Sequence, residues 1–148
     1  MKSKLLHEAG GARTFALVLD AGDEAMQALS KFADEQELDA ADFAAIGAFT
    51  GAVVAYFDPE TKEYEPIRVD EQVEVLSVNG HVTLEPGGRN VHAHAVLGKR
   101  DGTTVGGHLL EGHVGPTLEI VLTESPVHLR RRKDDETGLA LIDLSVAS

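Results

Sequence analysis

The sequence predicts an α+β domain built mainly on an antiparallel β-sheet. Two patterns favour this class: one amphipathic helical pattern near residues 23–38, and a long succession of short strand-like segments separated by glycine and proline. A length of 148 residues, 43% of them hydrophobic and 26% charged, is that of a single domain with its own core. The chain contains no cysteine, which excludes disulfides and thiolate metal sites.

The amino-terminal part begins with a lead and continues with the first strand and the helix. Residues 1–12 show no clear periodicity, and we expect a flexible lead there. Residues 13–20 have the composition of a strand and end at a turn signal. In residues 23–38, apolar side chains recur at three- and four-residue intervals, so we expect one face of this helix to lie on the sheet.

The remaining chain alternates strand-like segments with turns. Residues 43–49 and 51–57 are apolar runs interrupted by glycine, which predicts bulges or close backbone approach. Further short strands are expected after a turn at residues 58–62, over residues 63–68, 74–81, 82–85, 90–97, 104–110, 117–123, 127–132 and 138–144. We therefore expect one domain over residues 13–144 and a carboxy-terminal tail over residues 145–148.

The charge balance argues against nucleic-acid and membrane partners. Lys and Arg number 13 against 25 Asp and Glu, and the formal net charge of -12 repels phosphate backbones and anionic membranes. No apolar run approaches the roughly 20 residues of a membrane-spanning helix, and the first residues lack the core of a signal peptide. We therefore expect a cytoplasmic protein. Residues 130–133 form a basic cluster, but acidic residues follow at once, which favours a solvated hairpin tip over a DNA contact.

Four of the seven histidines lie within 22 residues, at His92, His94, His108 and His113. His92 and His94 share one face of a predicted strand, because side chains alternate along a strand. The turn that follows predicts a hairpin with a three-residue loop. In that register His94 stands opposite His108 and three imidazoles converge, whereas a bulge at Gly106 and Gly107 would reverse the face of His108.

This histidine pattern predicts an open metal site. Three neutral imidazoles suit zinc, nickel, copper or iron(II), and a three-histidine zinc site leaves a fourth position for water or a substrate oxygen. The alternative is that His92, His94 and His108 belong to a polar sheet face and are satisfied by solvent or by backbone carbonyls. The sequence leaves both interpretations open.

Other polar residues could support such a site. Glu119 lies between apolar residues in one predicted strand and Glu74 begins another, so each would need an imidazole or a metal as partner if its face were buried. The alternative for both is an ordinary glutamate on a solvated face. Glu111 is a further supporting candidate, and His113, in a predicted turn, is a further candidate ligand. The other histidines stand apart from any cluster: His7, His81 and His128.

Several segments, taken in order, resemble the plants-and-prokaryotes-conserved (PPC) domain family. They are residues 13–24 (RTFALVLDAGDE), 46–53 (IGAFTGAV), 74–80 (EVLSVNG), 92–94 (HAH), 101–102 (DG) and 106–109 (GGHL). The resemblance covers about residues 13–144. It implies an α+β fold with a central antiparallel sheet, a homotrimer in which the sheets of neighbouring protomers pack together, and a zinc-like metal site at His92, His94 and His108.

The resemblance also raises the question of DNA binding. In plants the domain accompanies an AT-hook, an Arg-Gly-Arg-Pro type of segment that enters the minor groove, and there the domain serves mainly assembly and partner binding. This chain has no such segment. Stand-alone prokaryotic members often carry a DNA-binding name transferred from the plant proteins, and the net charge of -12 argues against that activity here.

Three hypotheses about function follow. The preferred one is a homotrimeric module that binds a divalent metal, zinc or similar, through His92, His94 and His108 and has a regulatory, assembly or ligand-binding role. Its partners would be further copies of itself, a small molecule or a protein. The alternative is a metal-dependent hydrolase or lyase with Glu74 or Glu119 as general base. DNA binding through residues 130–133 would instead show an affinity that collapses with salt.

Overall fold

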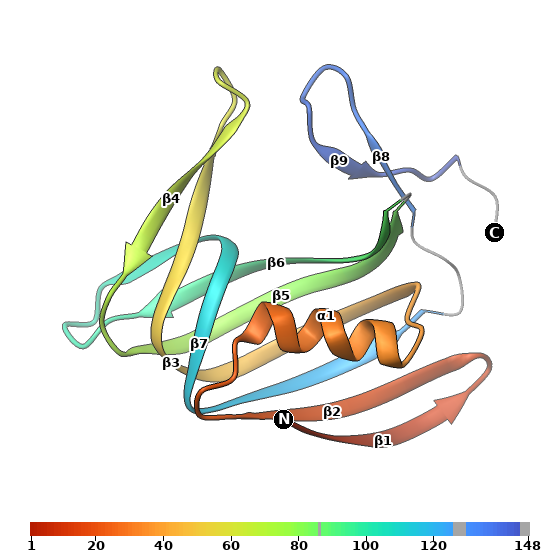
Figure 1. Ribbon diagram of the computed structural model, residues 1–148, viewed down its shortest axis with the longest axis horizontal. Coiled ribbons are helices and arrows are strands. Elements are labelled where there is room, and N and C mark those ends of the chain that lie inside the picture. Colours follow the sequence, from red (N-terminus) through yellow and green to blue (C-terminus); the bar gives the residue numbers. More distant parts are fainter. Residues whose placement is uncertain (86, 126–129, 146–148) are drawn as a thin grey trace.

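A computed structural model describes residues 1–85, 87–125 and 130–145, and in it a strongly curved β-sheet carries a single helix (Figure 1). The elements are β1 (Lys2–Ala9), β2 (Ala12–Asp20), α1 (Ala25–Glu35), β3 (Ala40–Asp58), β4 (Glu63–Val69), β5 (Val73–Glu85), β6 (Gly88–Gly98), β7 (Thr104–Glu124), β8 (Arg131–Lys133) and β9 (Ala140–Ile142). The expected class, α+β with a mainly antiparallel sheet, is confirmed.

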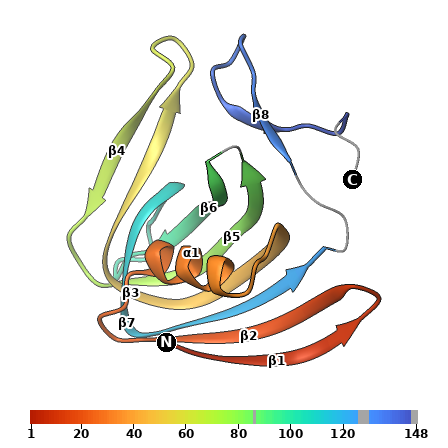
Figure 2. The same ribbon diagram turned by 45° about the vertical axis from the view of Figure 1, so that its right-hand side comes forward.

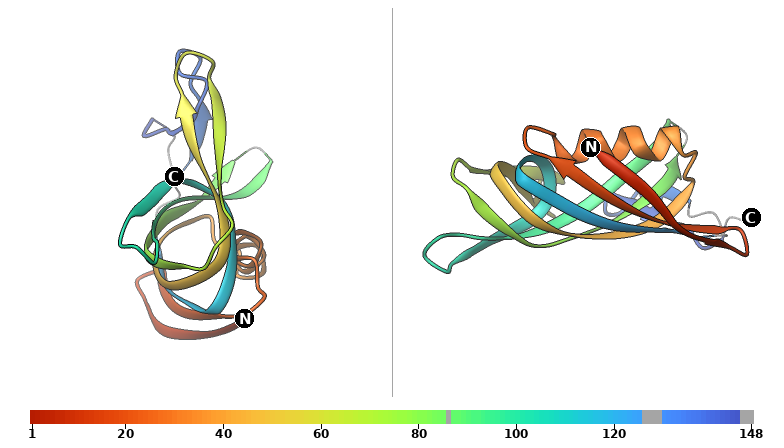
Figure 3. Two further views of the ribbon diagram at one scale, coloured as in Figure 1. Left: turned by 90° about the vertical axis from the view of Figure 1, so that its left-hand side faces the viewer. Right: turned by 90° about the horizontal axis from the view of Figure 1, so that it is seen from below.

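The large sheet is antiparallel and partly closed on itself. Over the described residues its seven strands run in the order β1-β2-β7-β6-β5-β3-β4, and β3 also pairs with β7. Strands β3, β5, β6 and β7 therefore form a ring, which Figure 3 (left) shows nearly end-on. β1 and β2 extend the sheet on one side, and β3 and β4 project as a hairpin (Figure 2). The short strands β8 and β9 pair separately.

Close backbone contact at Gly47 allows the long strands β3 and β7 to bend together. The register shifts beside Gly47 in the pairings of β3 with both β5 and β7. A Cβ atom at this position would lie 2.3 Å from the carbonyl oxygen of Thr117, a distance no side chain tolerates. The glycine interruptions in this region therefore mark bulges and close approach, as the sequence predicted.

The apolar inner face of the sheet and one face of α1 form the core. The helix buries four side chains: Ala25, Leu29, Phe32 and Ala33. Phe32 packs edge-on against Phe15 of β2, with ring centroids 5.2 Å apart. The amphipathic helix predicted from the sequence is thus confirmed in shorter form. Within the described ranges, no helix is long and apolar enough to cross a membrane.

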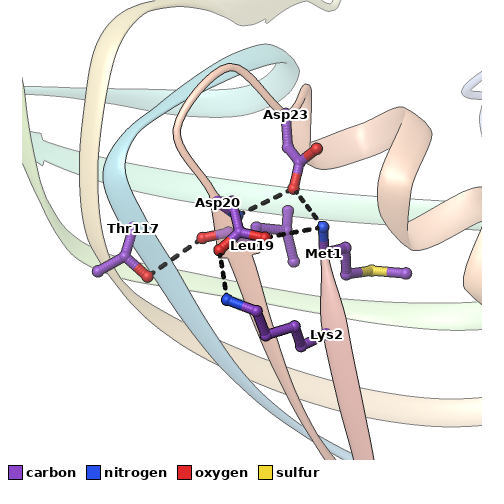
Figure 4. Close-up of polar contacts among 6 residues, drawn as sticks. All are labelled: Met1, Lys2, Leu19, Asp20, Asp23 and Thr117. Carbon is purple, nitrogen blue, oxygen red and sulfur yellow. Dashed lines mark hydrogen bonds and ion pairs between the residues drawn. The ribbon is translucent and has the colours of Figure 1, made fainter.

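Acidic side chains fix the turn from β2 into α1. The carboxylate of Asp23 accepts a hydrogen bond from the Asp20 backbone N–H at 2.9 Å, and both acids contact the Met1 ammonium group (Figure 4). Glu24 caps the helix by accepting hydrogen bonds from two N–H groups of its first turn. The same carboxylate accepts the N–H of Gly112 at 2.9 Å. The start of α1 is therefore tied to the middle of β7.

The amino-terminal segment differs from the prediction. Residues 1–12 are not a flexible lead, because Lys2–Ala9 forms β1 and pairs with β2 along its length. All eight residues of this edge strand are exposed. Without one buried face, the segment shows none of the alternation by which a strand is recognised in a sequence.

Several predicted boundaries also change. The helix spans Ala25–Glu35 instead of residues 23–38. Three regions in which the sequence predicted separate strands are single continuous strands: residues 40–58, 73–85 and 104–124. Backbone pairing continues through their glycine positions, so the glycines bend the strands without ending them.

The carboxy-terminal predictions are only partly covered. Residues 127–129 of the strand expected at 127–132 lie outside the described residues, and β8 begins at Arg131. The strand expected over residues 138–144 is the shorter Ala140–Ile142. Ser145 lies in a turn, and the rest of the expected tail is outside the described part of the chain.

Candidate metal centre

The β6–β7 hairpin sets the register of the histidines. Its loop is closed by a hydrogen bond from the Lys99 N–H to the Thr103 carbonyl at 2.8 Å. From the loop, the two strands pair without a shift as far as His94 and His108. The predicted three-residue loop and the predicted pairing of His94 with His108 are both confirmed, and no bulge interrupts the described hairpin.

Two glycines let β7 run close to its neighbours at this point. A Cβ atom at Gly106 would lie 2.7 Å from the carbonyl oxygen of Ala95 on β6. A Cβ atom at Gly107 would lie 2.5 Å from the carbonyl oxygen of Ala55 on β3. The glycine pair is therefore explained by strand geometry, which brings His108 in between β6 and the β3–β4 hairpin.

The side chains of His92, His94 and His108 meet on the outer face of the sheet. Their neighbours on β6, Ala93 and Ala95, are buried on the opposite face, as strand alternation requires. The Nε2 atoms of His92 and His94 are hydrogen-bonded at 3.1 Å. One ring nitrogen from each of the three histidines lies within 4.8 Å of the other two.

This donor set fits a transition-metal ion. Two nitrogens bound to tetrahedral zinc at roughly 2.0–2.1 Å lie about 3.3 Å apart, close to the 3.1 Å between the Nε2 atoms of His92 and His94. Among the described residues, the buried Nδ1 of His108 has no hydrogen-bond partner, which is uncommon for a histidine with a purely structural role. Zinc and the other metals that prefer imidazole match these ligands.

Burial favours the neutral form of His92 and His108. Desolvation is the largest cause that lowers the pKa of His92 to about 4, and the nearby Arg131, His108 and His94 lower it further. Burial also lowers the pKa of His108, with a smaller contribution from His94. Because a metal binds the deprotonated ring nitrogen, these shifts keep both imidazoles ready to ligate at neutral pH.

The ring of Tyr64 packs against the ring of His108. Its ring lies 4.6 Å from the His108 ring, centroid to centroid, with 32° between the planes. Phe57, on the other strand of the β3–β4 hairpin, packs against Tyr64 at 5.2 Å. Nothing in the sequence predicted a role for Tyr64, because its contact with His108 depends on where the β3–β4 hairpin lies relative to β7.

The carboxylates predicted as supporting groups lie elsewhere. Glu74 and Glu119 are exposed and together line a separate shallow depression with Ile46 and Leu76. Glu74 pairs with Gly98 on β6, four residues from His94, which corresponds to about 13 Å along a strand. The structure therefore does not bring these two glutamates to the histidines.

The other histidines that the structure describes lie in different parts of the fold, and one of them lies beside the cluster. His113 is exposed and faces Glu111, with 3.7 Å between its Nε2 and the Glu111 Oε2, and it is outside the cluster found among the described residues. His7 lies on β1, opposite Thr14. His128 is outside the described residues. His81, in contrast, pairs directly with His92 across β5 and β6.

Several residues around the cluster were not predicted from the sequence. A depression of about 450 Å³ beside His92 and His94 is also lined by Asp42, Asn79, His81 and Arg131. Asn79 and His81 are two positions apart on β5 and therefore share one face of that strand, as His92 and His94 do on β6. This spacing could have indicated a polar face on β5. The β5–β6 register that places this face beside His92 and His94 could not be predicted from the sequence.

A family model of the Plants and Prokaryotes Conserved (PCC) domain matches residues 6–126. The chain belongs to this family. The match to this domain, which we continue to abbreviate PPC, begins within β1 and ends before β8. The resemblance seen in the sequence suggested residues 13–144.

Solved structures of other proteins share this PPC fold. A PPC protein from Pyrococcus horikoshii is 32% identical with a TM-score of 0.83, and the match covers 91% of this chain and 94% of that one. A metal-containing protein from Archaeoglobus fulgidus is 36% identical with a TM-score of 0.82, and the match covers 96% and 99% of the two chains.

A curated relative is much longer than this chain. The bifunctional protein GlmU of Synechococcus sp. is 34% identical over 132 residues, which are 87% of this chain. The chain spans only 20% of the length of that protein. The PPC-like stretch is thus a minor part of the longer protein.

The lowered pKa of His92 predicts how the metal-free protein responds to acid. In the unfolded chain the imidazole takes up a proton near 6.5, and in the folded protein only near 4. Protons therefore favour unfolding in this window, and the free energy of unfolding should fall as the pH is lowered from 6.5 towards 4. Urea unfolding at a series of pH values measures this slope.

A His92→Gln variant should show a shallower slope than the wild type across the same pH window. His7→Gln, at an exposed edge-strand position, is the matched control and should keep the wild-type slope. Equal slopes for wild type and His92→Gln would contradict the burial effect.

Proposed function

We propose that this PPC domain is a homotrimeric module that holds a divalent metal ion, zinc or similar, at His92, His94 and His108 and has a regulatory, assembly or ligand-binding role. The observation that carries the metal centre is that three imidazole nitrogens lie within 4.8 Å of one another. The metal-containing Archaeoglobus relative, which this chain matches over nearly its whole length, supports it. Such an ion, when bound, would supply a Lewis acid with an open coordination position.

The chain itself prepares the ligands for binding. The core behind β6 fixes the backbone of His92 and His94, because Ala93 and Ala95 are packed into it. Tyr64 restricts the ring of His108. Burial favours the neutral form of two of the three imidazoles. Little reorganisation is then needed on metal binding, which favours a resident ion over occasional occupancy.

We favour binding over hydrolysis or lyase chemistry. Among the described residues, the histidine cluster contains no carboxylate: Glu74 and Glu119 line another depression, and Asp42, which lines the depression beside the histidines, is outside the cluster. A general base must come within hydrogen-bond reach of the proton it removes, directly or through one water. The small share of the GlmU relative that this chain spans also suits an accessory module.

We do not propose the basic cluster as a DNA-binding surface. Arg132 is paired with Asp143 at 3.1 Å, and Arg131 lines the depression beside the histidines. With a net charge of -12 for the chain, phosphate backbones meet a repulsive field. Nucleic acid is therefore not the partner we propose.

An exposed apolar face on β2, β3 and β7 supports the trimer. Ile46 is 62% exposed and Val121 53%, and Val18 is also exposed. Val18 and Ile46 pair with the same β7 residue, Glu119, so these side chains share one continuous face. An apolar face of this kind marks an interaction surface, and we propose that neighbouring protomers cover it.

The metal centre predicts the metal content of purified variants. We expect about one divalent ion per chain in the wild type, since three imidazoles suffice for a stable site. His94→Ala should lose the ion, because two ligands remain. His81→Ala is the matched control: it changes a histidine in the same depression but outside the cluster, and it should keep the ion. Elemental analysis after reconstitution with zinc and dialysis makes the measurement. Equal zinc in His94→Ala and wild type would contradict the site.

The apolar face predicts the assembly state. Light scattering should give three times the mass of one chain. Val121→Asp should reduce that mass, because a carboxylate would be desolvated in the interface. Leu144→Asp places the same charge at a side chain that is 91% exposed and away from this face, and should leave the mass unchanged. A monomeric wild type, or an unchanged mass for Val121→Asp, would refute the proposed interface.

A further inference from the structure

Arg131 reaches the histidine cluster from an element outside the PPC match. The match ends at residue 126, and Arg131 belongs to β8. Its side chain lines the depression of about 450 Å³ together with His81, His92 and His94. β8 is placed there by a bridge between its neighbour Arg130 and Leu84 of β5, beside the ends of β5 and β6 (Figures 1 and 2).

The guanidinium group of Arg131 is held in place but largely unpaired. One Nη1–H donates to the carbonyl of Ala140 at 2.8 Å, which fixes the side chain against β9. Its Nε is buried without an acceptor, and no carboxylate in the described ranges lies within ion-pair distance of it. Arg132, the next residue, is in contrast paired with Asp143. Since a guanidinium offers five donors, most of those of Arg131 are unused.

The charge of the depression differs from that of the whole protein. Asp42 and Arg131 are its only formally charged lining residues in the described chain, and their charges cancel while the histidines are neutral. Arg131 lies close enough to His92 for its charge to help lower the pKa of that ring. A divalent ion at the cluster would raise the local charge to +2, whereas the chain as a whole carries -12. An anion is the ligand that such a local field attracts.

We propose that this depression binds a small molecule bearing an oxyanion, a carboxylate or a phosphate, with Arg131 as its specific recognition residue. A guanidinium binds both groups through charge-assisted, bidentate hydrogen bonds. The volume of about 450 Å³ is in the range of small-ligand sites. The inference deepens the proposed function and rests on the metal centre for its second positive charge, while the contact made by Arg131 does not require the ion.

Calorimetric titration of the zinc-loaded protein tests this site. Inorganic phosphate and malonate are titrated separately, with no free zinc in the buffer. Arg131→Gln should weaken the binding about ten- to a hundredfold, as expected for the loss of charge-assisted hydrogen bonds. Arg132→Gln is the matched control on the same strand and should bind like the wild type. Arg131→Lys keeps the charge and should recover part of the affinity. The anion that binds more tightly in an Arg131-dependent way identifies the ligand class.

The outcomes separate this inference from the metal proposal. Elemental analysis of the same samples should show equal zinc in wild type and Arg131→Gln. Absence of anion binding to the zinc-loaded wild type, or equal affinities of Arg131→Gln and Arg132→Gln, would overturn the role of Arg131. If the wild type retains no zinc, the metal proposal fails and the titration is made on the metal-free protein. There, Arg131-dependent binding upholds the anion site, and its absence overturns it.

Discussion

The antiparallel pairing of β6 with β7 is the constraint on which the histidine cluster depends. Side-chain alternation puts His92 and His94 on one face, and only the unshifted register from the hairpin loop puts His108 beside them. A shift by one residue would turn His108 to the buried face. Gly106 and Gly107 lie so close to neighbouring carbonyl groups that a side chain at either position would clash with the backbone. A register shift is therefore resisted, because it would move a residue with a side chain into one of these positions. The geometry of the site is thus a property of the sheet.

Groups from distant parts of the chain then give the cluster its chemistry. Tyr64 restricts one imidazole from the β3–β4 hairpin, and His81 stands opposite another on β5. Arg131 adds a positive charge from β8, in a protein whose overall charge is strongly negative. An acidic surface repels anions in general, so a depression with a fixed guanidinium, made cationic by the proposed ion, would offer selectivity as well as attraction. This combination suits the ligand-binding module that we propose.

Short-range patterns predicted the parts of the structure that short-range interactions determine. Alternation and turn chemistry were enough to pair His94 with His108, and a periodicity of three to four residues was enough for α1. His81, Tyr64 and Arg131 were not predicted, because each depends on a strand register or a packing contact far along the chain. The edge strand β1 was missed because it buries no face. The sequence allowed Glu74 and Glu119 either as partners of an imidazole or a metal or as ordinary solvated glutamates, and in the structure both line a different depression.

The most direct test of the account is a crystal structure of the zinc-reconstituted protein with anomalous data collected on both sides of the zinc absorption edge. The account predicts an anomalous peak bonded to one ring nitrogen each of His92, His94 and His108, the three that already converge in the structure. It would be contradicted by three imidazoles that bond only to water or protein atoms, with zinc located elsewhere or nowhere on the chain.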